Sequence, residues 1–203
     1  MLDVLSRRGV PATFFVVGER LAHSECLALA ERAVAEGHWI GNHTYTHSVP
    51  FGLAADPAVV RDEIEQAQQV IGALSRPDRL FRPFGGGGHL NRNLLSRAAV
   101  DHLLAGSYTC VTWNAVPGDW RDPSGWVGRA VERCLAVEQA VLVLHDLATG
   151  AMAHLERFLL LAEAAGAQFT QIFPASCVLI RGGAIVGDLD GLVTETPRPR
   201  ADG

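Results

Sequence analysis

Short apolar runs alternate along this chain with longer segments whose apolar residues recur every three or four positions. Residues 12–17 are continuously apolar and rich in aromatic and β-branched side chains, which is typical of a strand covered on both faces. Further strands are expected at residues 38–41, 80–84, 108–113, 140–144 and 169–172. Helices are expected at residues 2–8, 19–36, 56–74, 92–104, 124–137 and 151–165.

Regular alternation of strand and helix predicts an α/β fold with a parallel sheet, either open or closed into a barrel. Polar side chains capable of chemistry follow the ends of predicted strands, at His43, His47, Arg82, His145 and Asp146. In a barrel, the carboxyl ends of all strands open onto one face, where active sites are built. Packing does not account for this concentration, so the pattern favours a barrel with a site at its mouth.

Length and composition narrow the picture further. At 203 residues the chain is expected to form one main domain, residues 1–180, followed by a C-terminal hairpin and flexible tail at residues 181–203. The net charge is −5 and no basic cluster is present, so we expect no nucleic-acid partner. No apolar run approaches the roughly 18 residues of a membrane span, so we expect no membrane partner.

The first residues and the cysteines indicate the cellular compartment in which the protein is expected. Met1 leads directly into a helical pattern, without a charged segment followed by an apolar one, so the sequence predicts a cytoplasmic protein. A start site upstream of Met1 would hide a signal peptide. The four cysteines are widely spaced and are expected to be reduced thiols, although a secreted protein could carry two disulfides.

His43 and His47 are the first candidates for chemistry. Two imidazoles four residues apart can bind one metal ion if the chain makes a helical turn after the strand, and neutral imidazole suits Zn²⁺. Alternatively, one histidine lies on the surface and the other caps a turn.

A glycine run at residues 85–88 and the pair His145-Asp146 are the next candidates. Glycines let the backbone approach a ligand and turn N–H groups toward an oxyanion, while Arg82 is suited to holding a carboxylate. His145 can act as a general acid if a nearby aspartate orients its ring. A plain flexible turn and a satisfied core histidine are the alternatives.

Together, the order and spacing of these segments resemble the successive motifs of the polysaccharide deacetylase family, also called the NodB-homology or carbohydrate esterase 4 domain. The resemblance covers residues 2–172. The matching segments are Ala12-Thr13-Phe14-Phe15-Val16, Gly41-Asn42-His43-Thr44-Tyr45-Thr46-His47, Phe81-Arg82-Pro83-Phe84-Gly85, Asp119-Trp120 and Val143-Leu144-His145-Asp146.

The resemblance implies a deformed β/α barrel that hydrolyses an N-acetyl or related amide with a divalent metal, Zn²⁺ first and Co²⁺ or Mn²⁺ as alternatives. In it, His43 and His47 are metal ligands, and Arg82 clamps the catalytic base. His145 is the general acid and Asp119 tunes it. The oxyanion site and acyl pocket are formed by Phe84, Gly85, Trp120 and Val143.

One family motif has no counterpart in this sequence. The family opens with a strand ending in T-F-D-D-G, which supplies the base and one metal ligand, and the chain begins after it. We prefer a true start upstream of Met1. The alternatives are a pseudoenzyme, or replacement of the missing carboxylate by Asp146 or Asp122.

Without that first strand, the barrel exposes the edge of the strand at residues 12–17. An exposed edge invites pairing, so we expect a homodimer through this edge, closure by a terminal segment, or poor solubility. Arg82 would then face no carboxylate partner.

The expected substrate is an N-acetylated sugar. The segment from Arg82 to Gly85 is one residue shorter than the family's usual R-P-P-Y-G, and Val143 replaces a common leucine. Both changes alter the acyl pocket, so two alternatives stay open. One is a small-molecule amidohydrolase acting on a ureide or imide, and the other is a catalytically dead carbohydrate-binding pseudoenzyme.

Overall fold

The computed structural model describes residues 1–54 and 56–195. Its helices are α1 Leu2–Arg8, α2 Gly18–Leu21, α3 Ser24–Ala35, α4 Pro57–Ile71, α5 Arg97–Ala105, α6 Trp126–Leu135 and α7 Leu155–Ala164. Its strands are β1 Thr13–Val16, β2 Trp39–Asn42, β3 Leu80–Phe81, β4 Leu95–Ser96, β5 Thr109–Val111, β6 Val178–Arg181, β7 Ala184–Ile185 and β8 Val193–Thr194.

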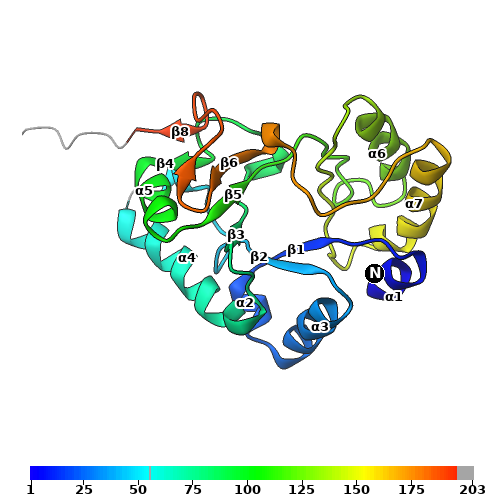
Figure 1. Ribbon diagram of the computed structural model, residues 1–203, viewed down its shortest axis with the longest axis horizontal. Coiled ribbons are helices and arrows are strands. Elements are labelled where there is room, and N and C mark those ends of the chain that lie inside the picture. The colour runs from blue at the N-terminus through cyan, green and yellow to red at the C-terminus, as the bar shows by residue number, and fades with distance from the viewer. Residues whose placement is uncertain (55, 196–203) are drawn as a thin grey trace, which may run out of the picture.

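A six-stranded sheet in the order β1-β2-β3-β5-β6-β7 forms the centre of the molecule. The first four strands are parallel, whereas β6 and β7 run antiparallel to their neighbours. A separate pairing joins β4 to β8. In Figure 1, helices α2 to α5 lie along one side of the sheet, and α1, α6 and α7 form a second group. The predicted α/β class is therefore confirmed, with a mixed sheet instead of a purely parallel one.

The sequence of helix α4, which packs beside the site described below, accounts for where the helix begins and which face it buries. Asp56 caps it by accepting a hydrogen bond from the Ala58 N–H, and Pro57 occupies its first turn. Every third or fourth side chain then faces inward, and four of these are buried: Val60, Ile64, Ala67 and Ile71. The opposite face carries charged residues and faces solvent and the loop after β2.

Two apolar clusters hold the two helix groups in place. The larger one joins α4 and α5 to the sheet through residues such as Ile64, Phe81 and Leu103. The second packs α6 and α7 against α1, with the fully buried Trp126 beside Phe158. Among the described residues, no helix combines the length and apolarity needed to cross a bilayer.

Three predicted elements differ from the structure. The helix expected at residues 19–36 is broken at Ala22 and His23, which separate α2 from α3. Residues 140–144 form only one parallel bridge, between Leu142 and Ala115, instead of a full strand.

The strand expected at residues 169–172 is absent, because these residues satisfy their backbone locally. The Thr170 hydroxyl accepts a hydrogen bond from the Ile172 N–H, and Ile172 is 77% exposed. The last sheet strands are instead β6 and β7, joined by the predicted turn at residues 181–183. The division of the chain at residue 180 stays a prediction, and residues 196–203 of the expected tail lie outside the described residues.

Strand β1 is an edge of the sheet and pairs only with β2. All four of its residues are half-buried, in contrast to the full coverage that their apolar character predicted. Its N-terminal end is held by the Ala12 N–H, which donates to His38 Nδ1, and by the Ala12 carbonyl, which accepts from Gln171 Nε2.

Candidate active site

His43 and His47 lie in the loop that follows β2, and their imidazoles face each other. The two Nε2 atoms are 3.2 Å apart. His43 Nδ1 lies 2.7 Å from the Arg82 carbonyl oxygen, which can only accept, so Nδ1 carries the proton and Nε2 has a free lone pair. Burial lowers the pKa of His43 to about 3, and burial followed by the charge of His145 lowers the pKa of His47. Both rings are therefore neutral at pH 7, which is the form that binds metals.

The loop reaches this geometry through unusual backbone conformations. Thr44 and His47 have φ values of 68° and 54°, in the left-handed region that side chains other than glycine disfavour. The buried Asn42 accepts a hydrogen bond from the Thr44 N–H and donates to the Ile64 carbonyl, which anchors the loop to α4. The Thr44 hydroxyl accepts from the His47 N–H.

We tested whether the residues present suit a metal ion. Two Zn–N bonds of 2.0–2.1 Å at a tetrahedral angle place the two nitrogens about 3.3 Å apart, close to the spacing of the two Nε2 atoms. The pair therefore fits two ligand positions of one ion. In the described part of the chain, no cluster of three histidine, cysteine or carboxylate side chains completes a site.

Neither of the carboxylates suggested as replacements joins the histidines. Asp122 accepts from Arg129 Nη1 at 2.9 Å and from the Gly125 N–H, and these bonds lower its pKa. Asp146 is exposed to solvent. Replacement of the family's missing carboxylate by either residue is therefore not supported.

Arg82 lies directly after β3 and is buried, with 8% of its surface exposed. Its guanidinium packs 4.1 Å from the centre of the Phe15 ring on β1, and its Nε has no hydrogen-bond partner among the described residues. Burial lowers the pKa of Arg82 to about 10. A buried cation without a counter-ion is costly in free energy, and a carboxylate is the group that would best offset this cost.

Asp119 and His145 form a hydrogen-bonded pair. Asp119 is fully buried, and its two carboxylate oxygens accept from the His145 N–H at 2.8 Å and from His145 Nδ1 at 3.0 Å. This fixes the proton on Nδ1 and turns Nε2 outward. The Trp120 ring stands edge-on to the imidazole at 4.6 Å.

The glycine segment after Arg82 closes over the histidine pair. The Phe84 ring lies 4.0 Å from the His47 ring. Gly85 has no room for a side chain, because a Cβ atom there would lie 2.5 Å from Trp113. Trp113 in turn donates from Nε1 to the Gly88 carbonyl. Within the described part of the chain, the N–H groups of Phe84 and Gly85 have no hydrogen-bond acceptor.

The structure thus brings together the predicted residues His43, His47, Arg82, Phe84 and Gly85. His145 belongs to the same group, because its charge acts on both histidines of the pair, and Asp119 and Trp120 contact it directly. Val143 lies apart from these contacts: its N–H donates to the Ala115 carbonyl and its side chain packs on the central core.

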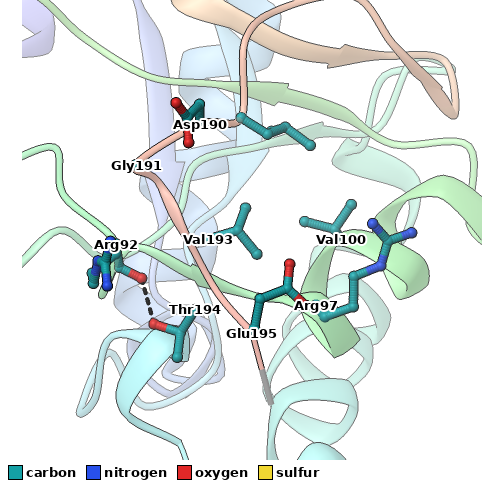
Figure 2. Close-up of a pocket in the computed structure, with 9 residues that line it drawn as sticks. Arg92, Arg97, Val100, Asp190, Gly191, Val193, Thr194 and Glu195 are labelled. Atoms are coloured by element: carbon teal, nitrogen blue, oxygen red, sulfur yellow. Dashed lines mark hydrogen bonds between the residues drawn. The ribbon is translucent and has the colours of Figure 1, made fainter. Parts of the chain in front are cut away.

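Two surface pockets lie outside this group. A pocket of about 500 Å³ opens between α5 and β8, where Figure 2 shows Arg97 and Val100 facing Val193 and Glu195. It contains none of the predicted site residues. A smaller pocket of about 230 Å³ borders the histidine loop, with Ser48 and Glu63 in its lining.

A sequence model of the family described as Polysaccharide deacetylase matches residues 1–102 of the chain. The chain belongs to the polysaccharide deacetylase family. A chitooligosaccharide deacetylase from Bradyrhizobium sp. (strain ANU 289) is 36% identical over 151 residues, which are 72% of this chain and 63% of the relative. The chain thus spans less than two thirds of the length of this curated family member.

Solved structures of the polysaccharide deacetylase family share the fold. A family 4 carbohydrate esterase from Streptomyces lividans, in complex with acetate, has a TM-score of 0.67 and 27% identity over 92% of this chain and 89% of its own. A family 4 acetyl xylan esterase from Clostridium thermocellum, in complex with a cobalt ion, has a TM-score of 0.64 and 25% identity, covering 83% and 78%. The predicted NodB-like fold is confirmed.

Sequence reasoning missed residues that support the site without carrying its chemistry. Two of them are Phe15, which packs against Arg82, and Trp113, which packs against the glycine segment. The sequence pattern indicated only that they belong to the core. Glu63 on α4, which contacts the histidine loop, is one of several charged residues on this helix, and its position in the sequence gave no signal.

Proposed function

We propose that this chain is a metal-dependent hydrolase domain that removes the acetyl group from an N-acetylated sugar. The observation that carries the proposal is the pair of facing, neutral imidazoles at His43 and His47, together with the hydrogen-bonded Asp119–His145 pair. The names of the relatives favour sugar substrates, and the acetate and cobalt ion in the two esterases favour an acetyl group and a divalent metal.

His43 and His47 would hold the ion through their Nε2 atoms. A bound divalent cation supplies Lewis-acid polarisation of the acyl carbonyl. The Phe84 ring contacts His47, and the N–H groups of Phe84 and Gly85, which have no acceptor among the described residues, are suited to stabilise negative charge on the carbonyl oxygen.

His145 would protonate the leaving amine. Its Nδ1 proton is held by Asp119, so Nε2 is the atom that exchanges a proton with the substrate. Because the Asp119 carboxylate is buried and also bonds the His145 backbone, the ring keeps one orientation throughout the reaction. The Trp120 ring packs edge-on against the imidazole.

Arg82 would orient the base that activates water. Its buried guanidinium is suited to pair with a carboxylate, and its Nε has no hydrogen-bond partner among the described residues. The proposal therefore requires a carboxylate at this position, and Asp122 and Asp146 do not supply it.

Acetate release tests the proposal. The purified 203-residue chain, supplied with Zn²⁺ or Co²⁺ and with formate as a small carboxylate for the Arg82 position, should release acetate from N-acetylglucosamine oligomers. His145→Ala should lower kcat by about 10²–10⁴-fold, the range of general acid–base catalysis, without changing metal uptake. The matched control is His23→Ala, at an exposed histidine outside the site, and it should leave kcat unchanged.

Other outcomes separate the alternatives. Binding of the oligomers without acetate release would contradict the proposal and favour a carbohydrate-binding pseudoenzyme. Release of product from a ureide or cyclic imide, with none from the oligomers, would favour the small-molecule amidohydrolase.

A further inference from the structure

The histidine loop is held from two sides. Its backbone carbonyls accept hydrogen bonds from the first N–H groups of α2, and one carboxylate on α4 accepts from its donors. One oxygen of Glu63, Oε2, accepts from the N–H groups of Tyr45 at 3.0 Å and Thr46 at 2.9 Å. The other, Oε1, accepts from the Thr46 hydroxyl at 2.7 Å. Three donors of one loop therefore converge on one side chain, which is half-buried between the loop and the helix.

These contacts fall on the residues between the two imidazoles. Tyr45 and Thr46 separate Thr44 from His47, the two residues with left-handed backbone. Such conformations persist only where neighbouring contacts hold them. Asn42 and the Thr44 hydroxyl hold the start and end of the loop, and Glu63 holds its middle. Without the contact to Glu63, two backbone N–H groups lose their acceptor, and the turn that brings His47 toward His43 keeps only the hydrogen bonds from α2, Asn42 and Thr44.

The neighbouring acids on α4 are engaged elsewhere. Asp62 accepts from Arg61, and Glu65 lies 3.8 Å from His102 on α5. Neither contacts the loop. The contact is therefore specific to Glu63 and is not a general consequence of the acidic face of this helix.

We propose that Glu63 is a positioning residue that sets the spacing of the His43 and His47 imidazoles and thereby the affinity of the site for a divalent cation. The proposal rests on the proposed function for the identity of the ligand. Glu63 acts through the backbone of Tyr45 and Thr46 and does not itself touch the ion. The carboxylate fixes the loop in its ligand-holding form before any cation binds.

Substitutions at Glu63 distinguish a positioning role from a general effect on the stability of the protein. Glu63→Gln keeps one oxygen for the two N–H groups and turns its amide toward the Thr46 hydroxyl, which can accept as well as donate. Glu63→Ala removes every contact. The matched control is Glu65→Gln, which changes the same charge on the same helix without touching the loop.

The first readout is zinc binding to the full chain, measured by isothermal titration calorimetry. Glu63→Ala should weaken binding by about 10–100-fold, the usual effect of removing a group that orients a metal ligand. Glu63→Gln should recover most of the loss, and Glu65→Gln should bind as the parent chain does. Binding by Glu63→Ala within about twofold of the parent would overturn the proposal, as would an equal loss in Glu65→Gln.

Hydrogen exchange of the metal-free proteins gives a readout that does not depend on the proposed function. In Glu63→Ala, the amides of the loop should exchange about tenfold faster or more than in the parent, whereas those of α6 and α7 should not change. If the parent binds no zinc but this local difference is present, the positioning role stands and the metal-dependent function fails. If loop exchange is the same in Glu63→Ala and the parent, the positioning role is wrong.

Discussion

At the scale of single residues, Arg82 places a cation in the protein interior without a counter-ion among the described residues. Burial lowers its pKa to about 10, so the folded state holds this proton less tightly than the unfolded state does. At pH 7 the group is charged in both states, and the folded protein carries the whole cost, on the order of a few kcal/mol. That cost decreases only once the pH rises above about 10.

Arg82→Met should therefore stabilise the chain in the absence of a carboxylate ligand. Methionine fills much of the same volume, removes the buried charge and keeps contact with Phe15. We expect the free energy of unfolding at pH 7 to rise by about 1–3 kcal/mol, because some favourable ring contact is lost with the cation. Urea unfolding of the two proteins measures this difference. A destabilised variant would mean that Arg82 has a counter-ion in solution.

At the scale of elements, β1 leaves half of its backbone hydrogen-bonding groups at the edge of the sheet. The Ala12 and Val16 carbonyls accept from β2 and its following loop, so by alternation the N–H groups of Thr13 and Phe15 point outward. An apolar, half-buried edge of this kind can add a further strand.

Thr13→Pro tests whether β1 mediates self-association. Proline removes an outward N–H and leaves the bonds to β2, which is the arrangement that an edge strand tolerates. We expect the parent chain to dimerise with rising concentration in sedimentation equilibrium, and the Thr13→Pro variant to remain monomeric with unchanged circular dichroism. Equal association of the two proteins would exclude the β1 edge as the interface.

The elements also show what sequence patterns can and cannot predict. Strong periodicity and a clear cap predicted α4 to within a few residues. The pattern could not separate α2 from α3, since the break at Ala22 and His23 carries no glycine or proline. The apolar run at residues 140–144 and the segment at residues 169–172 were expected to be strands, but a strand needs a partner, and pairing is decided by the rest of the fold.

At the scale of the whole molecule, motif order pointed to two contacts that the structure shows, one between the histidine loop and the residues after β3 and one between Asp119 and His145. His43 and Arg82 follow β2 and β3, and the common direction of these parallel strands brings the His43 ring to the Arg82 carbonyl. The residues that support the site could not be predicted in this way. Glu63 reaches the histidine loop only because α4 packs across β2, which depends on buried residues of both elements and not on any local motif.

The central claim is that His43 and His47 hold one divalent cation between their Nε2 atoms. Anomalous X-ray diffraction at the zinc edge, from crystals of the chain grown with Zn²⁺, tests it most directly. The account predicts an anomalous peak 2.0–2.1 Å from both Nε2 atoms, the usual Zn–N distance. A strong zinc peak elsewhere with none between these histidines, or imidazoles that point away from each other, would contradict it.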